Sequence, residues 1–348
     1  MLRFHHRRLR LALFFSYGLR RPNCVRRRVL PKERRGSILR LFLKEQDVVV
    51  GRNNLLRARC RTLTILSPVG RRRRLCPMSP NADELALKSR FIRNRSLAQA
   101  PVRLAIERRV CGCDYGGTSW TTAHEAKQVA ELLQLGRGKR LLDIGAGSGW
   151  PGLYLGAETG CDVVLTDMPE IGLQIAAARA EADANSGDCW VAAADGAALP
   201  FVNGSFDAVS HSDVLCCLTS KQGVLDSCRR VTRTGGRMAF TVISIALSLS
   251  AANHERADAA APPFAGIEAS YPDMLEQAGW DVTSHIDLTA DFLELTRLMV
   301  SEEKSHAVEL RDLHGEAGFT ARFTKHGLRI QALEEGLLRR ELFAATAA

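Results

Sequence analysis

Three glycines stand at alternate positions, Gly145, Gly147 and Gly149, directly after the apolar run 140–144. Glycine adopts positive φ at no steric cost and lets a ligand approach the backbone closely, so this spacing predicts a ligand-binding turn. A dinucleotide site needs G-x-G-x-x-G, but Trp150 stands where the third glycine is required, and the Gly-Lys-Ser/Thr of a phosphate loop is absent. The turn therefore favours a ligand whose amino-acid part lies against bare backbone.

Aspartates stand at the ends of three successive predicted strands, at positions 143, 167 and 195. Asp143 is placed near the ammonium group of such a ligand. Asp167, 24 residues further on, suits the two hydroxyls of a ribose, and Asp195 an adenine amino group. Each aspartate alone is also typical of a strand end or a helix cap. Three of them at the carboxyl edge of one sheet favour a nucleoside-containing ligand.

Two side chains after the fourth predicted strand are candidates for proton transfer, His211 and Asp213. A histidine titrates near neutral pH, which suits a general base. An equally good interpretation makes His211 a hydrogen-bonded part of the pocket wall. Tyr115, Trp120 and Tyr271 either line the same pocket or only pack.

No metal site is expected. None of the ten cysteines forms a C-x-x-C pair, so reduced thiols are the simplest interpretation. Cys111 and Cys113 lack a second pair at a suitable spacing. His306, His314 and His326 lack metal-ligand spacing and are expected on solvated helices.

The elements that would position these residues alternate between strand and helix. Thr122 and Glu125 can form a capping box for a helix that begins near Thr121. Short apolar runs predict strands and intervening amphipathic runs predict helices, which implies parallel pairing by crossovers. The strands are expected at 140–145, 162–167, 189–195, 206–210 and 235–244, with helices at 170–181 and 221–231.

Beyond residue 245 the alternation is interrupted. Residues 245–270 are rich in Ala and Pro and are expected to form a surface insertion that lies over the pocket mouth. A helix at 273–278, a strand at 280–288, mainly helix at 291–336 and a last strand at 339–346 follow. The whole pattern predicts a doubly wound α/β domain.

Residues 139–245 resemble the class I S-adenosylmethionine-dependent methyltransferases, in particular the group related to ubiquinone and menaquinone C-methyltransferases. The motifs that carry the resemblance are 143–149, Asp167, 194–201 with 205–209, and 230–237. It implies a seven-stranded sheet with an antiparallel last strand and methyl transfer to a small molecule. The cofactor contacts expected for S-adenosylmethionine are Asp143, Gly145, Gly147, Gly149, Asp167, Met168, Asp195, Gly196 and Ser212.

The chain departs from that family's pattern on the acceptor side. Cys217 falls about where the family often carries a histidine, so a base at that position is not implied. The tetrapeptide of adenine methylation and the Pro-Cys pair of cytosine methylation are both absent, which argues against nucleic acid as acceptor. Two alternatives stay open: an RNA-directed protein that uses the basic N-terminal segment, and a protein that binds the cofactor without turnover.

Charge divides the chain into two parts. Residues 1–77 hold 22 Lys/Arg and three Asp/Glu, a balance of +19, whereas residues 78–348 have a balance of −9. The first part is either a targeting segment, a nucleic-acid or membrane arm, or, as we favour, an extension outside the working protein, with synthesis starting at Met78. A tryptic peptide from residues 1–70 of the native protein would contradict that choice.

Residues 78–348 are accordingly expected to form the methyltransferase domain, with its cofactor core at about 121–245. The expected location is the cytoplasm, or an organelle if residues 1–77 are a targeting segment. No apolar run reaches the length of about 20 residues that a membrane span needs. Nothing in the sequence indicates the oligomeric state or the methyl acceptor.

Overall fold

The computed structural model describes residues 60–63, 82–168, 170–183 and 187–348. Most of the basic segment 1–77, and with it the expectation that synthesis starts at Met78, lies outside the described residues. The exception is Cys60–Leu63, which forms a short strand at the edge of the sheet. That strand was not expected from the sequence.

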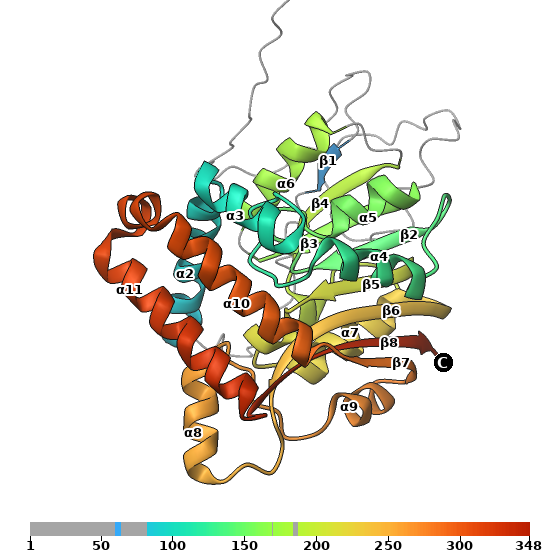
Figure 1. Ribbon diagram of the computed structural model, residues 1–348. Helices are drawn as coiled ribbons and strands as arrows, with labels where there is room; N and C mark the ends of the chain where they lie inside the picture. Colours follow the sequence, from blue (N-terminus) through green and yellow to red (C-terminus); the bar gives the residue numbers. More distant parts are fainter. Residues whose placement is uncertain (1–59, 64–81, 169, 184–186) are drawn as a thin grey trace, which may run out of the picture. The chain divides into compact units, whose positions relative to one another are not determined.

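The core is one sheet with the strand order β1-β4-β3-β2-β5-β6-β8-β7 (Figure 1). Seven strands match the prediction, and β8 alone runs antiparallel to its two neighbours, β6 and β7. The doubly wound sheet with an antiparallel last strand is therefore confirmed. The strands are β1 Cys60–Leu63, β2 Arg140–Ile144, β3 Asp162–Asp167, β4 Cys189–Ala193, β5 Phe206–Ser212, β6 Thr232–Ile245, β7 Trp280–Asp287 and β8 Leu338–Ala347.

Helices cover both faces of this sheet, which explains why its strands are apolar on both sides. Leu141 packs among residues of α4 Ala123–Leu132, α5 Gly152–Thr159 and α6 Glu170–Ala182. Its neighbour Leu142 points the other way, into a cluster with α7 Lys221–Val231 and α9 Tyr271–Gln277. The predicted capping box of α4 is present, because Thr122 and Glu125 each accept a backbone N–H from the other.

A helical layer lies beyond the carboxyl ends of the parallel strands, at the left of Figure 1. Apolar side chains from three of its helices and from the glycine-turn region pack together, among them Ile106, Trp150, Met299 and Phe319. A buried ion pair of 2.6 Å joins Arg103 to Glu303 across two of these helices. The layer consists of α2 Ala82–Ala98, α3 Pro101–Cys111, α8 Ala251–Ala260, α10 Thr289–Ser305 and α11 Ala307–Glu334.

The insertion at 245–270 is more ordered than its composition suggested. It contains α8, whose Ala257 and Ala260 are fully buried, and the Lys325 ammonium on α11 donates to two carbonyls at its end. Alanines on one helix face let α8 pack closely against α11. Two short 3₁₀ turns, η1 Gly196–Ala198 and η2 Leu215–Cys217, complete the described elements.

The expectation of a solvated position is wrong for His326. It lies on the inward face of α11 and is 6% exposed, with its Nε2 3.4 Å from a carboxylate oxygen of Glu303. Thr324 and Lys325 before it and Gly327 after it concealed this face in the sequence. Within the described ranges, the helices are all too short or too polar to cross a lipid bilayer.

Candidate functional site

The glycine turn stands at the carboxyl end of β2 and has the conformation that its sequence predicts. Gly145, Gly147 and Gly149 have φ values of +66°, +58° and +101°. A side chain at Gly145 would collide with Val214, and one at Gly149 with Leu153 of α5. Gly149 is therefore needed for close packing of the following helix and Gly145 for the close approach of Val214, whereas Gly147 leaves room above the turn.

Asp167 ends β3 beside this turn and binds two backbone amides. The Gly147 N–H donates to its Oδ2 over 2.8 Å and the Met168 N–H donates to its Oδ1 over 2.7 Å. The residue is 7% exposed, and burial raises the pKa of its carboxyl although a neighbouring guanidinium opposes the shift. A fixed carboxylate beside a bare glycine turn is the arrangement that a ribose with two adjacent hydroxyls requires.

That guanidinium belongs to Arg95 of α2, which was not singled out in the sequence. Its Nη2 donates to Asp167 Oδ2 over 2.6 Å, and its Nη1 occupies the space that a side chain at Gly147 would fill. Both oxygens of Asp167 already accept a backbone N–H, and Oδ2 also accepts Arg95. A ligand with two hydroxyls must therefore displace Arg95 from the carboxylate or share it.

Asp143 lies beneath the turn rather than at its surface. It is 1% exposed; its Oδ1 accepts the Ser210 hydroxyl at 2.7 Å and its Oδ2 the Gly152 N–H at 3.2 Å. Burial raises the pKa of this carboxyl to about 7. In this position Asp143 holds the turn and the start of α5 together.

The other expected cofactor residues border the same edge of the sheet. Met168 follows β3 and is 52% exposed, and Asp195 caps η1 by accepting the Ala197 N–H at 2.9 Å. Gly196 is buried beside Ile144, and Ser212 ends β5. The fold thus brings the expected cofactor residues, which span 70 positions of the sequence, to neighbouring strand ends, with Gly149 and Asp143 turned inward.

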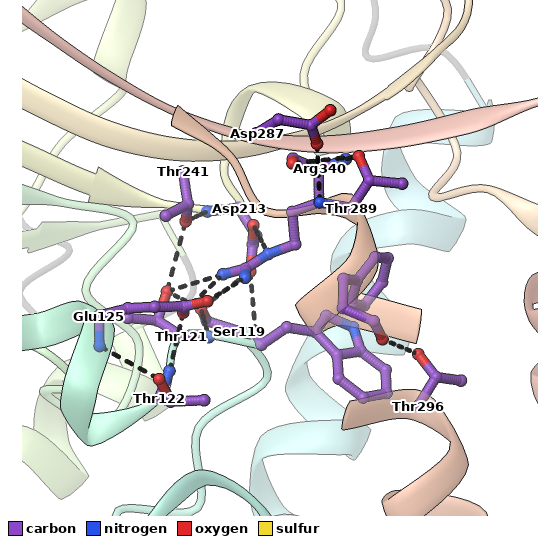
Figure 2. A network of polar contacts seen from close by, with 12 residues as sticks. Ser119, Thr121, Thr122, Glu125, Asp213, Thr241, Asp287, Thr289, Thr296 and Arg340 are labelled. Atoms are coloured by element: carbon purple, nitrogen blue, oxygen red, sulfur yellow. Dashed lines mark hydrogen bonds and ion pairs between the residues drawn. The ribbon is translucent and has the colours of Figure 1, made fainter. Parts of the chain in front are cut away.

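Asp213 is held in a buried network, which Figure 2 shows around Arg340 of β8. Arg340 is 0% exposed; its Nε lies 3.1 Å from Asp213 Oδ1 and its Nη1 2.7 Å from Glu125 Oε1. Asp213 also accepts the Trp120 N–H at 2.8 Å and the Ser119 hydroxyl at 3.0 Å. With its carboxylate fully engaged, Asp213 ties the segment after β5 to α4 and β8, which favours a positioning role over that of a base.

His211 points away from the edge, into the core on the α7 face of the sheet. It is 0% exposed, its ring stacks on Phe240 at 4.4 Å, and neither ring nitrogen has a hydrogen-bond partner among the described residues. Burial lowers the pKa of His211 to about 3, so the ring is neutral throughout the physiological range. A base role needs access to the acceptor, which this burial does not provide.

The burial of His211 predicts an effect on stability in acid. The pKa of His211 in the folded protein lies below its unfolded value of about 6.5. Its contribution to the free energy of unfolding is therefore complete above pH 6.5 and is lost as the pH falls below that value, which is about the unfolded pKa. His211→Phe should therefore gain about 2 kcal/mol relative to wild type when unfolding by urea is compared between pH 8 and pH 5. The effect of Asp143 on the pH dependence of stability has the opposite sign, because its pKa is raised in the folded protein. Asp143 is present in wild type and in the variant, so its effect cancels in the comparison.

His124→Phe is the matched control, because His124 is exposed at the start of α4. It should change stability equally at the two pH values. If His211→Phe also behaves in this way, the histidine is not held neutral in the folded protein.

The remaining aromatic candidates divide between packing and the site. Tyr271 is 1% exposed and its ring lies 5.8 Å from Phe240 in the core. Tyr115 stacks under the guanidinium of Arg179 at 3.7 Å. The ring of Trp120 packs against Phe292 in the helical layer. Its backbone N–H donates to Asp213, which places Trp120 beside the segment after β5.

Comparison with known proteins agrees with this geometry. Residues 142–240 match a family described as "Methyltransferase domain". The methyltransferase GfsG of Streptomyces halstedii is 26% identical over 171 residues, which is 47% of this chain and 60% of the relative. A demethylmenaquinone methyltransferase of Beutenbergia cavernae is 34% identical over 139 residues, 40% of this chain and 48% of the relative. The match thus spans about half the length of these relatives.

Solved structures share the fold. A phosphoethanolamine N-methyltransferase of Haemonchus contortus, in complex with phosphomonomethylethanolamine and S-adenosylhomocysteine, superposes with a TM-score of 0.61 at 16% identity. The superposition covers 73% of this chain and 60% of the other. At this identity the likeness shows a common fold, and the acceptor of that protein is not transferred to this chain.

Proposed function

We propose that this chain, which contains a class I S-adenosylmethionine-dependent methyltransferase domain, transfers the methyl group of that cofactor to a small-molecule acceptor. The family match over residues 142–240 and the strand order are those of the class I enzymes. The cofactor supplies an activated methyl group on a sulfonium. What this chain must add is binding, orientation and exclusion of water.

The observation that carries the proposal is the carboxylate of Asp167 beside the bare turn at Gly145 and Gly147. Two backbone amides fix this carboxylate, and the two glycines carry no side chain of their own, although the Arg95 guanidinium lies over Gly147 and Val214 lies beside Gly145. Trp150 supports the choice of ligand: it is 5% exposed and packs against Tyr115, where a dinucleotide site would need glycine. The turn would hold the methionine part, Asp167 the ribose, and the region of Met168, Asp195 and Gly196 the adenine.

Methyl transfer in this site would depend chiefly on positioning. Holding the acceptor in line with the methyl group at near-attack distance can supply up to about 7–11 kcal/mol of the barrier reduction. Asp213 contributes by fixing the segment after β5 against Trp120 and Arg340. Since His211 is enclosed and Asp213 is engaged, we propose an acceptor whose nucleophile needs no protein base, or loses its proton to water.

The relatives support a small-molecule acceptor, since the names of several describe methylation of small metabolites such as a quinone. We further propose that the domain works in a reducing compartment such as the cytoplasm, where the free cysteines between Cys111 and Cys228 would stay thiols. A nucleic-acid acceptor has no support from the described residues.

Labelled methyl transfer tests the proposal. The full chain is incubated with methyl-labelled S-adenosylmethionine and the dialysable metabolites of its native source, and label is followed in small molecules, protein and nucleic acid. Label should enter a small molecule with wild type and be lost with Asp167→Ala. Two outcomes would contradict methyl transfer to a small molecule. Label could enter only protein or nucleic acid, or no label could be transferred although the chain binds the cofactor.

A further inference from the structure

Arg329 is a buried cation without an anionic partner among the described residues. It lies on the inward face of α11 with His326 and Leu333, and is 8% exposed. Its Nε has no hydrogen-bond partner, and the one polar contact of the guanidinium is Nη1 to His326 Nδ1 at 3.4 Å. Among the described residues, nothing binds the edge formed by Nε and Nη2, which can hold a carboxylate or phosphate through two parallel hydrogen bonds.

The other buried arginines show what is missing here. Arg340 is paired with two carboxylates, and Arg95 is paired with Asp167. Arg329 has no carboxylate partner among the described residues; besides His326 it contacts the faces of Trp120 at 5.2 Å and Phe292 at 6.0 Å. Burial lowers its pKa to about 10, so it is still charged at neutral pH. A buried charge without a partner is costly, and a protein that keeps one usually uses it.

The position of Arg329 points to the acceptor side of the site. Trp120, on which it stacks, donates its backbone N–H to Asp213, directly after β5. Phe292 lies between Arg329 and Arg340, at 6.0 and 5.6 Å from their guanidinium carbons. The carboxylate of Asp213 also raises the pKa of Arg329, against the effect of burial. The free edge thus belongs to the region between α11 and the segment after β5, distinct from the strand ends at Asp167 and Asp195.

We propose that Arg329 binds the anionic group of the methyl acceptor, a carboxylate or a phosphate. The inference rests on the proposed function and narrows its substrate class to anionic small molecules. Stacking on Trp120 and Phe292 would keep the guanidinium plane in place, so that the acceptor is held by one end while its nucleophile is directed toward the methyl group.

The test measures binding to the full chain saturated with S-adenosylhomocysteine. Benzoate represents a carboxylate, inorganic pyrophosphate a phosphate, and benzamide is the neutral control of benzoate's shape. Wild type is compared with Arg329→Met and Arg329→Lys. The matched control is Arg311→Met, because Arg311 also lies on α11 and stacks on an aromatic ring, Phe319 at 4.3 Å, but is exposed and paired with Glu316.

Wild type and Arg311→Met should bind benzoate or pyrophosphate but not benzamide, and the anion that binds identifies the group. Arg329→Met should weaken this binding by about tenfold or more, with Arg329→Lys in between. Binding of neither anion to wild type, or equal binding to Arg329→Met, would overturn the inference.

Two further readouts separate this proposal from its premise. Arg329→Met should keep the melting temperature of wild type or raise it, since it removes an unpaired buried charge; a large decrease would mark Arg329 as structural. The affinity for S-adenosylhomocysteine should not change. If this affinity falls in Arg329→Met, the guanidinium holds the cofactor instead of the acceptor. If wild type does not bind S-adenosylhomocysteine, the proposed function itself fails.

Discussion

Asp167→Asn is expected to weaken the binding of S-adenosylhomocysteine by about tenfold or more, because hydrogen bonds to a charged acceptor contribute about 1.5–3 kcal/mol. The substitution keeps the size of the side chain, but its one carbonyl oxygen can accept only one of the N–H groups of Gly147 and Met168, and the amide nitrogen faces the other. It removes the charge that would accept two ribose hydroxyls. Isothermal titration of the full chain measures the change.

Arg95→Gln is the informative partner of that variant. It removes the guanidinium that occupies Asp167 Oδ2 but leaves the carboxylate in place. Binding should therefore be as tight as in wild type or tighter, because the ligand no longer competes with Arg95. If Arg95→Gln weakens binding as much as Asp167→Asn does, Arg95 itself contacts the ligand and the competition described here is wrong.

Arg340→Met is expected to lower the free energy of unfolding by about 3–5 kcal/mol, since it leaves Glu125 and Asp213 as buried carboxylates without a counter-charge. Arg340 also links three separate parts of the chain: α4, the segment after β5 and β8. Its loss should therefore loosen the acceptor side as well as the core. Urea unfolding followed by circular dichroism measures the loss.

Arg297→Met provides the control for the loss of a paired arginine. Arg297 forms two ion pairs, with Glu294 and Glu334, but on the exposed surface, so no measurable change is expected. Equal stability losses in the two variants would show that burial of the Arg340 network adds nothing. Recovery of stability when Glu125→Gln and Asp213→Asn are added to Arg340→Met would assign the loss to the stranded charges.

The fold was largely predictable because its main signals are local. The capping box at Thr122 and Glu125, the glycine turn and the apolar strands each depend on residues a few positions apart. The strand Cys60–Leu63 was not predictable, because it lies in a basic segment and its pairing with β4 spans more than a hundred residues. Helix α8 was missed because an Ala- and Pro-rich composition is also typical of a loop.

The site was predictable in its glycines and in Asp167, and not in its arginines. Arg95 meets Asp167 across 72 positions, and Arg340 meets Glu125 across 215. Such pairs depend on tertiary packing, to which a single sequence gives almost no clue. Arg340 gave little signal, because it stands between Arg339 and Glu341 at the start of the last strand, and alternation alone does not show which of the three is buried. Arg329 stands between Leu328 and Ile330, and which face of its helix is buried depends on tertiary packing that the sequence does not give.

The central claim is that the turn at Gly145 and Gly147, with Asp167, forms a site for S-adenosylmethionine and not for a dinucleotide. Isothermal titration of the wild-type full chain with S-adenosylmethionine, S-adenosylhomocysteine and NAD tests it most directly. We expect saturable one-to-one binding of S-adenosylmethionine and of S-adenosylhomocysteine, and no binding of NAD. Binding of NAD, or no binding of either sulfur compound to folded protein, would contradict it.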